Sequence, residues 1–141
     1  MITEIEPKGF SPKFHSTGIY LIHDGRFVTL KRSDDYKGKW STPGGGIEKG
    51  EDPHDTIVRE VKEECGLTIE KTKLRKVGTY NIRYPEFDFR YTIFTYYLDN
   101  REEIVLDKNE HSEIRWVTPD EALQLDLIMD EDYCIRKAFG L

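Results

Sequence analysis

The chain has 141 residues, of which 37% are hydrophobic and 34% are charged, and its formal net charge is −6. This length suits a single domain over residues 1–141, and the composition is typical of a soluble globular protein with a heavily charged surface. The acidic balance, without a segment rich in Lys and Arg, argues against a surface that binds duplex nucleic acid through phosphate contacts.

Signals for targeting and for redox chemistry are weak. No run approaches the roughly 18 apolar residues that span a bilayer, and residues 1–10 have neither the basic nor the apolar region of a secretory signal. The two cysteines, Cys65 and Cys134, form no C-x-x-C pair and are expected to be reduced, partly buried thiols. We therefore expect a cytoplasmic protein with no membrane partner, either a monomer or a homodimer.

The N-terminal third is predicted to form a β-hairpin. Asp24-Gly25 is a strong signal for a two-residue hairpin turn. The run at residues 19–22 indicates burial on both faces of a sheet. The segment before the hairpin has two prolines and little periodicity, so it either pairs as an edge strand or stays loose. The predicted elements are this segment (1–13), two strands (14–23 and 26–32) and a long loop rich in turn residues (33–46).

Residues 53–65 are predicted to form a well-capped helix. Asp52 is a candidate N-cap, Pro53 falls at the first helical position, and Gly66 supplies the stop. Four apolar residues share one face, whose centre lies roughly 120° from that of three glutamates. We therefore expect the apolar face to pack on the sheet and the acidic face to point outward. The apolar residues are Ile57, Val58, Val61 and Cys65, and the acidic ones are Glu60, Glu63 and Glu64.

The second half of the chain is predicted to add three strands and two helices. Aromatic and β-branched residues indicate the strands, and Thr118-Pro119-Asp120-Glu121 is a capping box with proline at the first helical position. Helices among hairpin-connected strands favour an α/β or α+β fold, in which helices cover a mixed sheet. The strands are expected at 74–82, 89–98 and 113–117, the loops at 83–88 and 99–110, and the helices at about 118–127 and 131–139.

The glutamates of the first helix point to a metal ion. Glu60, Glu63 and Glu64 stand at i, i+3 and i+4, so a helix places them on one face, where like charges repel. Mg²⁺ prefers oxygen ligands and takes one or two carboxylates together with waters and substrate phosphates. Glu60 and Glu64 lie one turn apart and could bind one ion together, with Glu63 serving a second ion or orienting the first. On charge alone, however, such a run is more often a solvated helix face.

Neighbouring residues would complete such a site. Glu51 precedes the helix and can approach the same face from the loop. Arg59 and Glu63 are i, i+4, so their ion pair would hold a carboxylate in place. Glycines 44–46 let the backbone come close to a ligand without a side-chain penalty. Together these residues suit the metal-assisted attack of water on a phosphoanhydride.

The spacing of these residues matches a family signature. From Gly45 the chain reads G-x5-E-x7-R-E-U-x-E-E-x-G-U, where U is a bulky aliphatic residue, and W-x-x-P-G-G leads into it at 40–45. The stretch E-I-R-W-V-x-x-D-E-A-L at 113–123 resembles the usual close of the same domain. The chain thus resembles the Nudix hydrolases over almost its whole length. The fixed positions are Gly45, Glu51, Arg59, Glu60, Val61, Glu63, Glu64, Gly66 and Leu67.

This resemblance implies a fold, a cofactor and a reaction. The fold is an α/β/α sandwich with a mixed sheet, in which the signature forms a loop–helix–loop. The cofactor is Mg²⁺, for which Mn²⁺ often substitutes, and the reaction is hydrolysis of a nucleoside diphosphate linked to a further moiety. Carried over by position, the implied metal ligands are Glu60 and Glu64, then Glu63 and Glu51, with backbone oxygen from Gly44 or Gly45, and Arg59 would orient the glutamates.

The general base differs among Nudix subfamilies. It is either a signature glutamate, here Glu63, or a glutamate from a late loop, for which Glu110 is the candidate. The alternative for Glu110 is an exposed loop acid without a catalytic role. Similarly, Lys31 and Arg32 close a strand where relatives often place a phosphate-binding base, and we favour that role for Arg32 over an ordinary strand-end charge.

The residues beyond the signature bear on the substrate. Tyr84 stands 17 residues after Leu67 and Pro85 stands 18 after it. They resemble the tyrosine marker of dinucleoside polyphosphate hydrolases and the proline marker of ADP-ribose hydrolases, in adjacent positions. Four aromatic residues in this region could stack on a nucleobase, but at strand spacing we predict core positions for most of them. These are Tyr84, Phe87, Phe89 and Tyr91.

The favoured substrate is a nucleoside or deoxynucleoside triphosphate or a similar small nucleotide. Dinucleoside polyphosphates and ADP-ribose are the alternative substrates. A non-catalytic module that senses nucleotides is a second kind of function, against which the intact set of glutamates argues. A protein-interaction domain with a merely acidic helix is a third, and the complete signature argues against it.

Overall fold

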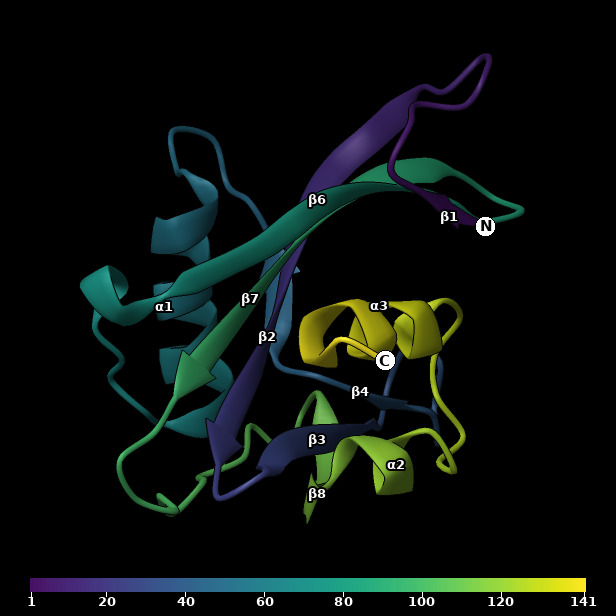
Figure 1. The fold of residues 1–141 in the computed structure, drawn as a ribbon. Helices are drawn as coiled ribbons and strands as arrows, with labels where there is room; N and C mark the ends of the chain where they lie inside the picture. The colour runs from purple at the N-terminus through teal and green to yellow at the C-terminus, as the bar shows by residue number, and fades with distance from the viewer.

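The computed structural model describes all residues, Met1–Leu141, as a mixed sheet with helices on both of its faces (Figure 1). This architecture confirms the predicted mixed α/β class. The elements are β1 (Ile2–Thr3), β2 (Pro12–His23), β3 (Arg26–Arg32), β4 (Trp40–Ser41), β5 (Gly44–Gly46), α1 (Pro53–Cys65), the 3₁₀ turn η1 (Lys71–Lys73), β6 (Arg75–Arg83), β7 (Asp88–Tyr97), β8 (His111–Val117), α2 (Pro119–Ala122) and α3 (Glu131–Phe139).

The long strand β2 organises the sheet. The strand order is β1-β6-β7-β2-β3-β4, with β5 paired to β2 and β8 paired to β3. Strands β2 and β7 run parallel, whereas β6 and β7, β2 and β3, and β2 and β5 are antiparallel. Because β5 pairs with the middle of β2, the glycine-rich segment is held against the centre of the sheet, directly before the chain enters α1.

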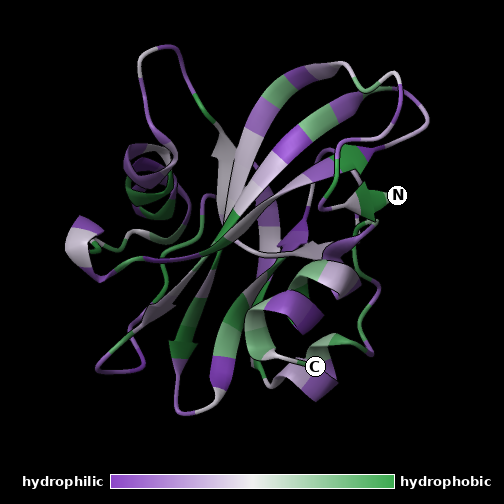
Figure 2. Ribbon diagram, turned by 45° about the horizontal axis from the view of Figure 1, so that its top comes forward, coloured by the Kyte–Doolittle hydropathy of each residue, from purple (hydrophilic) through white to green (hydrophobic).

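Two apolar clusters lie on opposite faces of the sheet. Ile19 and Leu21 of β2 contribute to the cluster under α1, whereas Tyr20 and Ile22 contribute to the cluster under α2 and α3. This alternation confirms that the apolar run is buried on both faces, as a central strand between two helical layers requires. Figure 2 shows hydrophobic and hydrophilic bands alternating along the long strands where they extend beyond this run.

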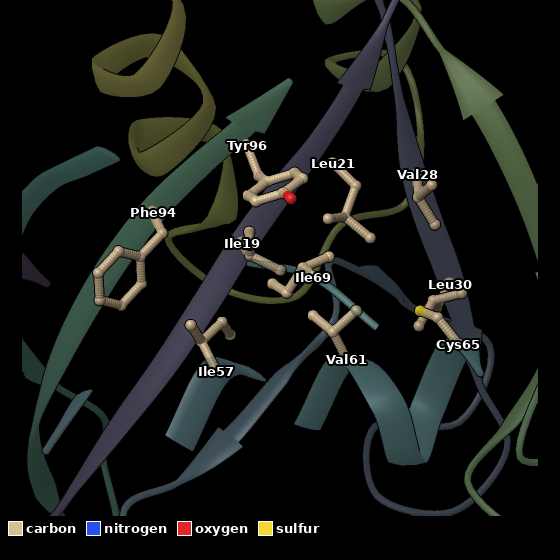
Figure 3. Packing of buried hydrophobic residues seen from close by; sticks show 10 residues of the cluster. All are labelled: Ile19, Leu21, Val28, Leu30, Ile57, Val61, Cys65, Ile69, Phe94 and Tyr96. Carbon is tan, nitrogen blue, oxygen red and sulfur yellow. The ribbon is translucent and has the colours of Figure 1, made fainter. Parts of the chain in front are cut away.

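Helix α1 packs on the sheet through the predicted apolar face. The buried side chains of Ile57, Val61 and Cys65 meet Ile19 and Leu30 from the sheet (Figure 3). Each fully buried aliphatic side chain contributes roughly 1.5–3 kcal/mol relative to an exposed one. These contacts fix the rotation of α1 about its axis, and therefore the direction in which its glutamates point.

The predicted local signals are confirmed at both ends of α1 and in the hairpin. The Asp52 carboxylate accepts a hydrogen bond of 2.9 Å from the backbone N–H of Asp55. Gly66 ends the helix with φ at 71°, the left-handed conformation that glycine adopts without strain. Asp24 and Gly25 have φ of 51° and 74°. Two positive φ values in succession are the geometry of a type I′ hairpin turn.

Two predicted boundaries are wrong. The helix expected over 118–127 begins with the predicted capping box but ends at Ala122. Leu123 and Gln124 form a turn, and residues 126–128 then pair with β4: the Trp40 N–H donates to Asp126 O at 2.8 Å, and the Ile128 N–H donates to Trp40 O at 3.0 Å. The long loop expected over 33–46 contains the short strands β4, which pairs with β3, and β5, which pairs with β2.

The N-terminal segment adopts the paired alternative. Ile2 and Thr3 form β1, which pairs with β6 at the edge of the sheet, and β2 begins at Pro12. No helix of the structure is long and apolar enough to span a membrane.

Candidate active site

One cavity of about 410 Å³ joins the glycine strand, helix α1 and the segment before α3. This volume is in the range of small-ligand sites. Its wall combines a polar set of side chains and glycine backbone with an aromatic set. The polar set includes Arg32, Gly44, Gly45, Gly46, Glu60, Glu64, Glu110 and His111, and the aromatic set is Phe14, Tyr36, Tyr84, Phe87, Phe89 and Tyr91.

Arg59 lies at the centre of an ion-pair network beside the cavity. Its guanidinium donates to both oxygens of Glu51, with the Nε–Oε2 bond at 2.9 Å. It also donates to Glu60 Oε1 at 3.0 Å and to the Glu63 carboxylate at 3.3 Å, which confirms the predicted i, i+4 pair. The hydrogen bond from Arg59 is the main reason that the pKa of Glu51 is lowered to about 2. One arginine thus balances several carboxylates and fixes the position of Glu60.

Replacing Arg59 with lysine tests this positioning role. Lysine keeps the charge but loses the planar fork that contacts Glu51 and Glu60 at once. We expect catalytic turnover and metal affinity to fall by roughly 10- to 100-fold, as for other groups that orient metal ligands. Steady-state kinetics and calorimetric titration with Mn²⁺ would measure both effects. A variant with unchanged metal affinity would show that Arg59 only stabilises the helix.

The acidic face of α1 does not point outward, so that prediction is wrong. Glu64 is 4% exposed and the side chain of Glu60 is 13% exposed, because strand β5 lies over this face. The Gly44 N–H donates to Glu64 Oε1 at 2.8 Å. At Gly45 any Cβ would overlap the carboxyl group of Glu60. Only Glu63 remains largely exposed, with 54% of its side chain accessible.

Burial makes it costly to ionise Glu60 and Glu64 together. Burial raises the pKa of Glu64 to about 9, with a further increase from the neighbouring Glu60 and Glu110 charges. Burial also raises the pKa of Glu60 to about 7, against the opposing effect of Arg59. Ionising two buried carboxylates side by side is costly unless a cation joins them. The donor set therefore fits a divalent cation, as the sequence predicted.

Glu110 directly precedes β8 and His111 begins it, and both line the cavity together with Glu64. The ligand atoms of Glu64, Glu110 and His111 all lie within 4.8 Å of one another, so these side chains could hold a metal ion. His111 is 1% exposed, and burial lowers its pKa to about 4. The imidazole is therefore neutral at physiological pH, which is the form that binds metal ions.

The predicted site residues divide into two groups. The cavity brings together seven of them, and three lie outside its wall because Arg59 draws the carboxylates of Glu51 and Glu63 to itself. The residues in the cavity wall are Arg32, Gly44, Gly45, Glu60, Glu64, Tyr84 and Glu110, and those outside it are Glu51, Arg59 and Glu63.

The core prediction for most of the aromatic residues is correct for Phe89, which is 7% exposed. Tyr91 packs against the cluster under α2 and α3, whereas Tyr84 and Phe87 are only half-buried. Tyr84, Phe87, Phe89 and Tyr91 all line the cavity. The connection between β6 and β7 extends beyond α3 (Figure 1), on the side where the Tyr84 hydroxyl donates to Met129 O just before that helix, so the aromatic side chains there border the cavity. Phe89 is the best packed of the four and contacts the other three rings and Phe14.

Sequence reasoning missed His111 and Glu131. His111 directly follows the candidate base Glu110, and this adjacency was the only available signal. Glu131 is the first residue of α3, where an acid is ordinary. Yet it is 3% exposed and lines the cavity, and burial raises its pKa to about 8. At neutral pH Glu131 is therefore mainly protonated.

This titration predicts a loss of stability as pH rises. The pKa of Glu131 is about 8 in the folded chain and 4.5 when the group is fully solvated, so the stability that this group contributes is lost as pH rises between those values. Glu131→Gln removes the titration. The variant should gain a few kcal/mol of unfolding free energy relative to wild type between pH 5 and about pH 8. Urea unfolding across this range measures the difference, and a difference that does not vary with pH would contradict the assignment.

Comparison with known proteins agrees with the signature and the fold. The sequence profile of the NUDIX domain matches residues 12–138. A MutT-like protein of Streptomyces ambofaciens is 30% identical over 129 residues, or 89% of this chain and 77% of the relative. The nucleoside triphosphatase NudI of Escherichia coli O139:H28 is 31% identical over 119 residues, or 76% of this chain and 83% of NudI. The crystal structure of a MutT protein from Methanosarcina mazei Go1 has a TM-score of 0.76 and 25% identity, covering 92% of this chain and 94% of that one. The chain therefore belongs to the Nudix hydrolase family.

Proposed function

We propose that this chain is a single-domain, Mg²⁺-dependent hydrolase that cleaves a phosphoanhydride bond in nucleoside or deoxynucleoside triphosphates. One observation carries the proposal: buried carboxylates and an aromatic wall face the same cavity of about 410 Å³. Such a cavity can hold the charged and the aromatic part of one small nucleotide at once. The similarity to the nucleoside triphosphatase NudI supports the substrate class.

The polar and the aromatic residues of the cavity wall would have distinct roles. Glu60 and Glu64 would bind the Mg²⁺ ion, for which Mn²⁺ could substitute, with a backbone oxygen of Gly45. The ion, when bound, would neutralise phosphate charge and favour the attack of water. Arg32, which lines the cavity, would contact the phosphates. Tyr84 would stack against the base, as aromatic rings in ligand sites do.

The remaining signature residues would support this chemistry from outside the cavity wall. Arg59 would orient Glu60, and Glu51 would keep Arg59 in place through its paired hydrogen bonds. Glu110 lines the cavity, whereas Glu63 is held by Arg59 at the surface. We therefore propose that Glu110 takes the proton from the attacking water, and that Glu63 tunes the charge around Arg59.

A cytoplasmic location is part of the same proposal. Both cysteines are free and buried, which suits a reducing compartment. Neither thiol is required for the reaction described above.

A substrate panel tests the proposed specificity. We would measure kcat/KM for nucleoside triphosphates, dinucleoside polyphosphates and ADP-ribose with the purified chain in Mg²⁺. The proposal expects the highest kcat/KM for a triphosphate, with a nucleoside monophosphate and pyrophosphate as products. A higher kcat/KM for ADP-ribose or a dinucleoside polyphosphate would contradict the proposed substrate class. It would leave the proposed hydrolysis of a phosphoanhydride bond intact.

A module that binds nucleotides without hydrolysing them is the second candidate function. It would bind a nucleotide in the same cavity and release no product. The complete set of signature glutamates and the buried Glu60 and Glu64 pair favour catalysis, because binding alone does not need two buried acids beside each other.

A further inference from the structure

His111 is a buried side chain whose hydrogen-bonding capacity is unused. It begins β8, where its backbone pairs with Arg32 at the end of β3, and it is 1% exposed. Neither Nδ1 nor Nε2 has a hydrogen-bond partner in the protein. Leaving a buried polar group without a partner is energetically costly. The site therefore needs a ligand for this imidazole that the protein itself does not provide.

The neighbours of His111 are carboxylates. Its Nδ1 lies 3.7 Å from Glu64 Oε2, which is longer than a normal hydrogen bond. The other oxygen of Glu64 is already engaged by the Gly44 N–H at 2.8 Å. Glu110 completes a group whose ligand atoms all lie within 4.8 Å of one another. A neutral imidazole thus faces the free oxygen of a buried carboxylate, and no bond joins them.

This separation matches two ligands of one metal ion. Ligand atoms about 2.1 Å from a shared ion are about 3.0 Å apart at right angles and about 4.2 Å apart on opposite sides. The observed 3.7 Å falls between these limits. The backbone holds the pair in place, since the Asp107 N–H donates to Glu64 O at 3.4 Å and the His111 N–H donates to Asp107 O at 3.0 Å.

We propose that His111 is a metal ligand, and that its imidazole and the Glu64 carboxylate bind the same divalent cation. The proposal rests on the proposed function, because Glu64 belongs to both ligand sets. Glu110 borders the ion and keeps its role as the proton acceptor for water. Coordination positions that none of the proposed protein ligands takes are left to water and substrate phosphates.

A nitrogen ligand changes which ions the site prefers. Mg²⁺ takes oxygen ligands almost exclusively, whereas imidazole suits transition metals. Compared with a site made of carboxylates alone, this one favours Mn²⁺, Co²⁺ and Ni²⁺ over Mg²⁺. His111→Gln removes the imidazole and should weaken Mn²⁺ binding by about 10- to 100-fold, with a smaller loss for Mg²⁺.

Pulsed electron paramagnetic resonance of bound Mn²⁺, without nucleotide, tests the ligand directly. Wild-type protein should show coupling between Mn²⁺ and a ¹⁴N nucleus, and growth on ¹⁵N-labelled histidine should change it to the ¹⁵N pattern. The coupling should be absent in His111→Gln. It should persist in His23→Gln, because His23 contacts Leu98 O, away from the cavity. The isotope experiment uses wild-type protein, so it stands even if the variant folds poorly.

The possible results separate this inference from the proposed function. Bound Mn²⁺ without nitrogen coupling, or with coupling that persists in His111→Gln, overturns the role of His111 and leaves the carboxylate site intact. Failure of the wild-type protein to bind Mn²⁺ at all overturns both. Coupling that disappears only in His111→Gln supports the inference.

Discussion

Replacing Glu64 with glutamine should lower turnover by about 10³-fold, the scale of loss when an electrostatic stabiliser of a reaction is removed. The Glu64 carboxylate is buried between Gly44 and His111, where glutamine has the same shape but no charge to bind a cation. Steady-state kinetics with a nucleoside triphosphate would measure the loss. Glu70→Gln is a matched control, because Glu70 lies on the surface and pairs only with Lys73 in the adjoining turn.

The fold should survive this substitution even though Glu64 is buried. Glutamine Oε1 can still accept the hydrogen bond from the Gly44 N–H, and the variant no longer has to bury an acid. Its melting temperature without metal should equal or exceed that of wild type. Mn²⁺ should raise the melting temperature of wild type by mass action but not that of the variant. Turnover close to wild type would contradict the assignment of Glu64 as a metal ligand.

Alanine substitutions in β5 should separate folding from catalysis. At Gly44 a Cβ would overlap the backbone carbonyl of Thr17, which cannot move without breaking the pairing of β5 with β2. Gly44→Ala should therefore cost at least about 1–3 kcal/mol of stability, the usual cost of overpacking. At Gly45 the overlap is with the Glu60 carboxyl group, which can rotate away. Gly45→Ala should therefore lower turnover by about 10²-fold with a smaller loss of stability.

Gly46 is the matched control for this series. A Cβ there meets nothing within 4 Å, so Gly46→Ala should keep both its stability and its turnover. Urea unfolding and steady-state kinetics on the three variants would give both quantities. Equal loss of stability at Gly44 and Gly45 would show that β5 as a whole, and not the carboxyl of Glu60, limits the substitution.

Local signals in the sequence were enough to predict α1 and the hairpin. The Asp52 cap, the Gly66 stop and the Asp24-Gly25 turn each act through neighbours within a few residues, so the sequence alone specifies their geometry. The apolar face of α1 was predicted for a similar reason, because periodicity along one helix does not depend on its partner.

The burial of the acidic face of α1 could not be predicted from local signals. What buries Glu64 is strand β5, whose three glycines carry no side-chain pattern and pair with residues 16–18, distant in sequence. The early end of α2 has a related cause. The pairing of Trp40 with Leu127 overrides the helical preference of residues 123–126, which follow α2. Pairing between distant segments is the information that a single sequence does not display.

The sequence predicts only some of the residues that line the cavity. Glu60, Glu64 and Gly45 follow from the signature spacing, whereas His111, Glu131 and the aromatic wall come from segments that meet only in the folded chain. The aromatic residues alternate as a buried strand would. Their role differs because they meet the segment that leads into α3, where the Tyr84 hydroxyl donates to Met129 O, and that contact depends on tertiary structure and not on periodicity.

The most direct test is pyrophosphate release from a nucleoside triphosphate by the purified chain, titrated with Mg²⁺ from a chelated, metal-free start. We expect no release without metal, a saturable rise with Mg²⁺, and restoration of the rise when Mg²⁺ is added back after chelation. Hydrolysis that continues unchanged in excess chelator, or no hydrolysis of any nucleotide at saturating Mg²⁺ and Mn²⁺, would contradict it.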